Sequence, residues 1–162
     1  MIKRAGVRMG IVLAGCLVGS LAALDQAQAA TSRSGVIGKF DGVDEVVEAC
    51  TNTQGFVAVP QMSRSFNVGG SASSVVVTFS ASARVSGVDF DTGFVRLMID
   101  GQQQSPGEVP FVAVGGPLGD ANAFTWQTKS LRTGSHTAQV QWRTDQGSEF
   151  CVDARSLVVL HR

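Results

Sequence analysis

Residues 75–85 read VVVTFSASARV, and this alternation indicates the fold class of the chain. Val75, Val77 and Phe79 begin a series of apolar or small side chains at every second position, while Thr78 belongs to the more polar series between them. Successive side chains of a β-strand point to opposite faces, whereas an amphipathic helix repeats its apolar residues about every 3.6 positions. The segment therefore predicts a strand with one buried face and one solvated face.

A second alternating segment, residues 134–143 (GSHTAQVQWR), places Ala138, Val140 and Trp142 on one face. The alternate positions, Thr137, Gln139, Gln141 and Arg143, fall on the solvated face. The other strand candidates are residues 46–51, 55–59, 65–68, 94–100, 109–114, 124–131, 149–152 and 156–161. The last candidate is apolar on both faces, which predicts a central position in its sheet. About ten short strands separated by turn signals are typical of a sandwich or barrel. We therefore expect an all-β protein, an antiparallel β-sandwich of about 8–10 strands and, more specifically, a jelly roll.

The N-terminal residues carry an export pattern. Three basic residues, Lys3, Arg4 and Arg8, precede an apolar run over residues 9–24, and a small-x-small pattern ends at Ala29. This order is that of a secretory signal peptide, so we expect a protein that is secreted or periplasmic. The expected segments are a signal peptide over residues 1–29, a flexible lead-in over residues 30–39 and a single domain over residues 40–162.

Two alternatives to soluble export remain open. Residues 13–16, LAGC, resemble the lipobox of bacterial lipoproteins, which would anchor the chain through a lipid on Cys16 and would indicate a bacterial origin. The apolar run of residues 9–24 is shorter than the roughly 20 residues of a membrane-spanning helix, and its retention as an anchor is the second alternative. After processing at Ala29 we expect no membrane span.

The charge of the exported part disfavours nucleic acid as a partner. The full chain has 13 basic and 13 acidic side chains, and removal of residues 1–29 takes away three basic residues and one acidic residue. A net charge of about −2 remains, with no run of basic residues that could neutralise a phosphate backbone. We therefore expect no nucleic-acid partner.

Two cysteines follow the export signal, Cys50 and Cys151, and they lie 101 positions apart. In an oxidising compartment two isolated cysteines usually pair, so we predict a disulfide between an early strand and one of the last two strands. Closing a loop of about 100 residues stabilises a fold by up to ~4.7 kcal/mol in the chain-entropy model. A reactive thiol or metal pair is the alternative, although neither cysteine belongs to a C-x-x-C motif.

No catalytic set is evident in the sequence. Ser135 precedes His136 directly, but neighbouring residues of a strand point to opposite faces and cannot form a nucleophile–base pair. Neither a G-x-S-x-G elbow nor an H-E-x-x-H zinc motif occurs. We therefore expect a protein that is not an enzyme. The alternative is a small exported hydrolase that uses two loop carboxylates among Asp89, Asp91, Glu108 and Asp120.

Loop residues and one tryptophan are the binding candidates. Asp89 and Asp91 have the spacing of the first two ligands of a calcium loop, and Asp120 and Asn122 would add oxygen atoms from another loop. The later acidic ligands of the motif are missing, so the alternative is a pair of turns whose carboxylates bind their own backbone. We expect no cofactor, with Ca²⁺ as the open alternative. Trp126 could stack on a sugar if exposed, although its place in an apolar alternation also suits the core.

Residues 134–143 (GSHTAQVQWR) together with residues 153–159 (DARSLVV) resemble the closing strands of small extracellular jelly-roll modules, some similar to C1q/TNF-like domains and others to phage-tail modules. The resemblance implies a binding or structural head, often trimeric, and carries no site residues over to this chain. Because the sequence shows no assembled nucleophile–base pair or metal set, we expect a secreted, non-enzymatic module that binds a surface, a glycan or a protein partner. The alternatives are the hydrolase above and a structural subunit that self-associates as a homo-oligomer.

Overall fold

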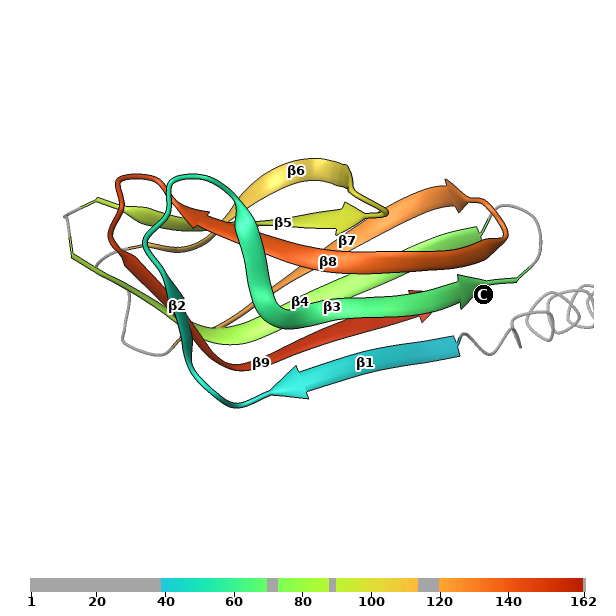
Figure 1. Ribbon diagram of the computed structural model, residues 1–162, viewed down its shortest axis with the longest axis horizontal. Coiled ribbons are helices and arrows are strands. Elements are labelled where there is room, and N and C mark those ends of the chain that lie inside the picture. The colour runs from blue at the N-terminus through green and yellow to red at the C-terminus, as the bar shows by residue number, and fades with distance from the viewer. Residues whose placement is uncertain (1–38, 70–72, 88–89, 114–119, 162) are drawn as a thin grey trace, which may run out of the picture. The chain divides into compact units, whose positions relative to one another are not determined.

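The computed structural model describes residues 39–69, 73–87, 90–113 and 120–161, and every regular element in them is a β-strand (Figure 1). The nine strands are β1 (Lys39–Glu45), β2 (Ala49–Thr51), β3 (Val57–Val68), β4 (Ser73–Ser86), β5 (Thr92–Ile99), β6 (Gln102–Ala113), β7 (Asp120–Leu131), β8 (Gly134–Thr144) and β9 (Glu149–His161). The predicted all-β class is confirmed. No helix long and apolar enough to cross a membrane occurs in the described residues.

The strands form two antiparallel sheets that face each other. Sheet A has the order β1-β9-β4-β7, with β2 also paired to β9, and sheet B has the order β3-β8-β5-β6. Neighbours in the chain such as β3 and β4 lie in different sheets, so the chain crosses between the sheets repeatedly (Figure 1). With β2 left aside, the longer strands have the order of a jelly roll. The predicted jelly-roll sandwich is therefore confirmed.

The alternation of each strand explains how the two sheets adhere. Val77 and Phe79 of β4 are fully buried, and so are Val95 and Leu97 of β5 in the opposite sheet. The residues between them on each strand face outward and stay at least partly exposed. Each large apolar side chain buried in this way stabilises the fold by about 1.5–3 kcal/mol. The inner faces hold the sandwich together, which leaves the outer faces available for function.

Cys50 and Cys151 form the predicted disulfide, which joins β2 to β9. The two residues are direct partners in the antiparallel register, with their Cα atoms 4.0 Å apart. Because β2 has only three residues, its backbone pairing is short and the covalent link holds it on the sheet. Strand β9 contains the apolar residues 157–160 and lies between β1 and β4, in the central position that its composition predicts.

The structure corrects several strand boundaries. Candidates 55–59 and 65–68 belong to one strand, β3, whose register shifts in its middle. The last two candidates likewise form β9, which has an irregularity where Ala154 adopts a positive φ of 39°. A β-bulge interrupts the alternation of side chains without ending the strand, so the pattern divides each long strand in two. Strand β1 is not among the sequence candidates, and Val46, the predicted start of a strand, is 76% exposed in the β1–β2 loop.

Candidate functional site

The outer face of sheet B carries a cluster of long polar and aromatic side chains, which we call the platform. Its members are Phe56, Phe94, Arg96, Gln103, Glu108, Gln139, Gln141 and Arg143. The outward positions of β5 and β8 alternate with buried ones, so each strand lines the face with every second residue. Antiparallel pairing then sets Arg96 of β5 beside Gln141 of β8, and Phe94 beside Arg143.

Of the two arginines in the platform, Arg143 is paired with carboxylates of the protein. Its Nε and Nη2 donate to the two carboxylate oxygens of Glu108 over 3.1 and 3.2 Å, and its Nη1 donates to Asp145 over 3.1 Å. The guanidinium carbon lies 4.5 Å from the centre of the Phe94 ring, and the side chain crosses β5 to reach Glu108 on β6. Hydrogen bonding to Glu108 raises the pKa of Arg143 against the opposing effect of burial. Two carboxylates of the protein therefore neutralise this cation.

Arg96 is held differently, by neutral groups. Its Nε and Nη2 donate to Oε1 of Gln141 over 2.9 and 2.7 Å, and its Nη1 donates to Oε1 of Gln103 over 2.9 Å. The side-chain amide of Gln141 in turn donates to Gln139 over 3.1 Å, which fixes its orientation. No carboxylate lies within ion-pair distance of Arg96 in the described part of the chain. Amides thus orient the guanidinium, and none of the described carboxylates forms an ion pair with it.

Phe56 connects the two arginines. The segment between β2 and β3 brings its ring over the sheet, 4.0 Å from the guanidinium carbon of Arg96 and 5.5 Å from that of Arg143. This segment is itself fixed to β8, because the backbone amide of Thr144 donates to the carbonyl of Thr53 over 2.8 Å. A cation above the face of an aromatic ring contributes about 0.5–1 kcal/mol at exposed sites. The platform is therefore an ordered surface in the free protein.

The polar surface continues from the platform toward β3 with short hydroxyl side chains. Ser63 donates to the carbonyl of Ala138 over 3.3 Å, and the hydroxyls of Ser65 and Thr137 lie 3.3 Å apart.

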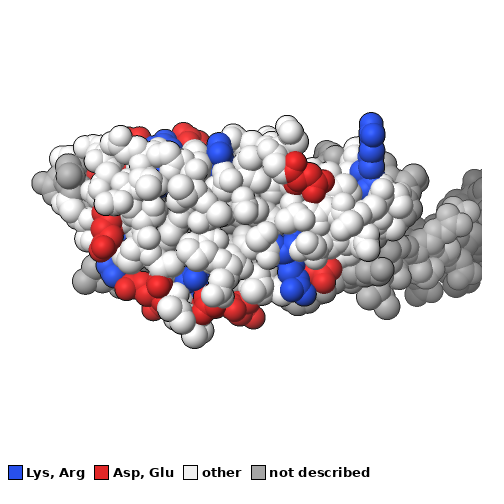
Figure 2. Space-filling view, viewed as in Figure 1, with Lys and Arg blue, Asp and Glu red and all other residues white. Residues whose placement is uncertain are grey.

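Two surface hollows of about 120 and 250 Å³ contain no platform residue and are smaller than the usual ligand pocket of roughly 300–1,000 Å³. Figure 2 shows one face of the molecule, on which charged side chains are scattered among neutral ones. The outer face of sheet B, rather than either of these two hollows, is therefore the candidate site.

Asp91, one of the predicted binding residues, is completely buried and fixes two loops to each other. Its Oδ1 accepts hydrogen bonds from the amides of Thr92, Asp145 and Gln146 over 2.7, 3.0 and 2.9 Å. Its Oδ2 accepts one from the amide of Ser148 over 2.8 Å. Burial alone would raise the pKa of Asp91, but these hydrogen bonds outweigh it and lower the pKa to about 2. The carboxylate binds backbone, which is the structural alternative left open by the sequence.

The other predicted binding residues lie apart from the platform or outside the described residues. Trp126 is 1% exposed and packs against Phe124 with the ring centroids 4.7 Å apart, so it offers no face to a ligand. Asn122 lies on β7 in sheet A, on the other side of the sandwich from the platform. Asp89 lies outside the described residues, as does the side chain of Asp120 at the start of β7. The described candidates therefore do not converge on one site.

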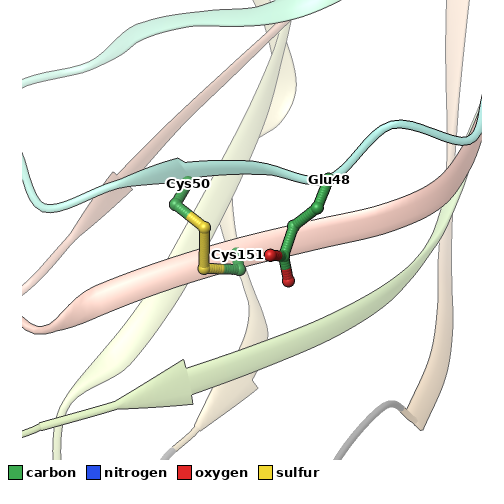
Figure 3. A group of neighbouring side chains, drawn as sticks. All are labelled: Glu48, Cys50 and Cys151. Carbon is green, nitrogen blue, oxygen red and sulfur yellow. A yellow bond between two sulfur atoms is a disulfide. The ribbon is translucent and has the colours of Figure 1, made fainter.

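One group of candidate metal ligands comes together in the described residues, namely Glu48, Cys50 and Cys151 (Figure 3). Both sulfur atoms are joined to each other in the disulfide, and the carboxylate of Glu48 is paired with Arg84. The thiolate is the form of cysteine that binds metal, and a sulfur in a disulfide is not a thiolate. This group is therefore not a metal site.

The described carboxylates of the hydrolase alternative have other partners. Glu108 is ion-paired within the platform, and the lowered pKa of Asp91 is the opposite of what a general acid needs. His136 is also engaged, since its Nδ1 lies 2.6 Å from a carboxylate oxygen of Asp100 and its Nε2 lies 2.8 Å from the carbonyl oxygen of Arg132. In the part of the chain that the structure describes, Glu108, Asp91 and His136 therefore all have protein partners.

Sequence reasoning did not single out the platform. The alternation of residues 134–143 correctly placed Gln139, Gln141 and Arg143 on the solvated face of their strand. A usable signal was the presence of an arginine on the outward positions of two different strands, at Arg96 and Arg143. That signal does not say that the two strands are neighbours, which follows only from the pairing of β5 with β8.

Comparisons with known proteins give distant likenesses in structure alone. No protein-family model matches the sequence, and no curated protein matches it. The C-terminal domain of EclA, described as a sugar-binding protein, is similar with a TM-score of 0.44 and 13% identity over 70% of this chain and 78% of that chain. A family 35 carbohydrate-binding module from Clostridium thermocellum has a TM-score of 0.41 and 18% identity over 75% of this chain and 90% of that chain.

A third similar structure is the CBM36-1 domain of a multidomain xylanase from the hindgut metagenome of Trinervitermes trinervoides. It has a TM-score of 0.41 and 13% identity over 74% of this chain and 96% of that chain. Likenesses at this level carry no argument about function. The functional proposal therefore rests on the side chains of this chain.

Proposed function

We propose that this protein is an extracellular, non-enzymatic module that binds a glycan on the platform of sheet B. The observation that carries the proposal is the row of amide and guanidinium groups from Gln139 through Gln141 and Arg96 to Gln103. Sugar hydroxyls both donate and accept hydrogen bonds, so they match a surface whose amides also do both. The partly exposed ring of Phe56 adds an apolar surface for the C–H groups of a sugar.

Order in the free protein supports this function. Immobilising one flexible side chain on binding costs about 0.5–1.5 kcal/mol. Arg96, Gln141 and Arg143 are already held by the hydrogen bonds described above, so little of this cost remains for a ligand to offset. The row crosses β8, β5 and β6 on an open face, which suits an extended chain of sugars better than a single enclosed sugar.

The extracellular location is part of the proposal. The Cys50–Cys151 disulfide supports it, because disulfides seldom persist in a reducing cytosol. The signal peptide proposed over residues 1–29 and the alternative lipid on Cys16 both lie outside the described residues. Mass spectrometry of the exported protein distinguishes them, since the first leaves an unmodified N-terminus near Ala30 and the second leaves a lipid on Cys16.

Glycan-array screening followed by calorimetry on single variants tests the proposal. Gln141→Ala removes the amide that links Gln139 to Arg96, and we expect it to weaken glycan binding by about fivefold, the equivalent of one hydrogen bond of about 1 kcal/mol. Thr125→Ala is the matched control, because it removes a side-chain hydrogen bond with Thr78 from the outer face of sheet A. It should leave the affinity unchanged. Equal losses in the two variants would place the site elsewhere, and a protein that binds no glycan would refute the proposal.

A further inference from the structure

The two arginines of the platform differ in whether a carboxylate of the protein neutralises their charge. Arg143 binds the carboxylates of Glu108 and Asp145, whereas Arg96 binds only amide oxygens. Building on the glycan-binding function proposed above, we propose that the ligand of the platform is an acidic glycan whose carboxylate or sulfate group binds the guanidinium of Arg96.

The guanidinium of Arg96 retains hydrogen-bonding capacity for such a group. Arginine carries five N–H donors. Gln141 and Gln103 take three of them. An oxyanion can accept two parallel N–H bonds in a charge-assisted pair, which is roughly twice as strong as a neutral hydrogen bond. A neutral hydroxyl would use a donor without compensating the charge, whereas an oxyanion does both.

The surroundings of Arg96 strengthen its attraction for an anion. The side chain is partly buried, and the Phe56 ring covers it at 4.0 Å, so water reaches only part of the guanidinium. Coulomb attraction increases as the effective dielectric constant falls below that of water. Because Gln141 and Gln103 hold the group without neutralising it, the positive charge is oriented before the ligand arrives.

The two carboxylates that bind Arg143 do not neutralise Arg96 as well. Glu108 lies opposite Arg96 in the β5–β6 register, yet both of its carboxylate oxygens accept hydrogen bonds from Arg143. Asp145 is directed to the same cation. Three other arginines of the described residues, Arg64, Arg84 and Arg143, have carboxylate partners. Arg155 donates to backbone carbonyls but is buried, so it is closed to a ligand. Arg96 combines neutral hydrogen-bond partners with a partly exposed position among the other polar groups of the platform.

Matched polymers test the inference with the full chain. Dextran sulfate and dextran share a backbone and differ in sulfate, while polygalacturonate and its methyl ester differ in free carboxylate. We expect about tenfold or greater preference for at least one charged polymer over its neutral counterpart, and the arm that shows it identifies the anionic group. Arg96→Gln should abolish this preference. Arg96→Lys, which keeps the charge but loses the planar fork, should retain part of it.

Arg64→Gln is the matched control, because it removes the same charge from β3 outside the platform, where Arg64 is paired with Asp41 at 3.8 Å. It should leave the preference within about twofold of the wild type. Equal binding of charged and neutral polymers by the wild type, or equal losses in the Arg96→Gln and Arg64→Gln variants, overturns the acidic-ligand inference and leaves glycan binding intact. Failure to bind every polymer and every arrayed glycan overturns the proposed function itself. If circular dichroism shows that Arg96→Gln is unfolded, the inference is tested by the preference of the wild type for charged over neutral polymers and by the partial preference expected for Arg96→Lys.

Discussion

The two outer faces of the sandwich follow the same alternation but carry different chemistry. On sheet A, the hydroxyl of Thr78 pairs with that of Thr125 over 2.9 Å, and the hydroxyl of Ser80 pairs with that of Ser156 over 2.8 Å. On sheet B, the outward positions of β5 and β8 hold the long, polar side chains of the platform. Alternation alone specifies that a face is solvated. The side chains at its outward positions determine whether that face can bind a ligand.

Side-chain length is one difference between the faces, although sheet A also carries Arg84, which is paired with Glu48 and Glu149. Serine and threonine hydroxyls lie close to the backbone and bond to one another across neighbouring strands. Guanidinium and amide groups end farther from the sheet and carry more donors than their neighbours can accept, as at Arg96. The proposed function places binding on the outer face of sheet B, and variants on each face can test this division.

Removal of the disulfide in sheet A should have the largest effect on stability and little effect on binding. The double variant Cys50→Ala/Cys151→Ala opens a link between residues 101 positions apart, and the free energy of unfolding should fall by about 2–5 kcal/mol in chemical denaturation. Glycan affinity below the unfolding transition should stay within about twofold, because Thr53 is tied to β8 independently of the disulfide. A large loss of affinity would show that the two faces are coupled.

The buried carboxylate of Asp91 should have the next largest effect. Asp91→Asn replaces one accepting oxygen by an NH₂ group, which would face an amide donor, and should cost about 2 kcal/mol of unfolding free energy. Because the folded-state pKa is lowered from 3.8 to about 2, the stabilisation is present above pH 3.8 and is lost as the pH falls toward 2. Urea unfolding at several acidic pH values should show a smaller loss for Asp91→Asn than for the wild type. Parallel losses would contradict this role.

His136 lies at the opposite end of β8 from the Asp91 loop and should contribute less to stability. Its contribution should be lost as the pH rises, whereas that of Asp91 is lost as the pH falls. Its hydrogen bond to Asp100 raises the pKa of His136 above 6.5, since the protonated ring is favoured in the folded state. The stabilisation is complete below pH 6.5 and is lost as the pH rises through the folded-state pKa. It should amount to less than about 1 kcal/mol, because the Asp100 side chain is 47% exposed and water screens the pair. In thermal unfolding, the melting temperature of His136→Gln should therefore depend less on pH over this range than that of the wild type.

The smallest effect is expected on the outer face of sheet A. Thr125→Val leaves the hydroxyl of Thr78 without its partner at 2.9 Å and should lower the free energy of unfolding by about 0.5 kcal/mol. Adding Thr78→Val removes both polar groups and should restore most of that loss. Neither variant should change glycan affinity by calorimetry. A clear reduction of affinity would move binding to sheet A and end the distinction between the faces.

The alternating pattern predicted much of the inner face. Val77, Val140 and Trp142 were assigned to apolar faces and are buried, and the predicted pairing of Cys50 with Cys151 is confirmed. The bulged strands β3 and β9 were divided in two, because a bulge breaks the period of two that the prediction depends on. The binding candidates were drawn from loop residues that resemble ligands, and Asp91 shows how such a residue can instead serve the backbone.

Local periodicity and a single cysteine pair sufficed for the extended strands, their buried sides and one covalent link, because each depends on near neighbours or on a unique partner. The surroundings of Arg96 could not be obtained in that way. Gln141 is 45 positions distant in the chain and Gln103 is seven. They meet at one guanidinium because β8, β5 and β6 are adjacent in a particular register, while Phe56 arrives from a loop. Strand order and register follow from the packing of whole sheets, and many orders satisfy the same alternation.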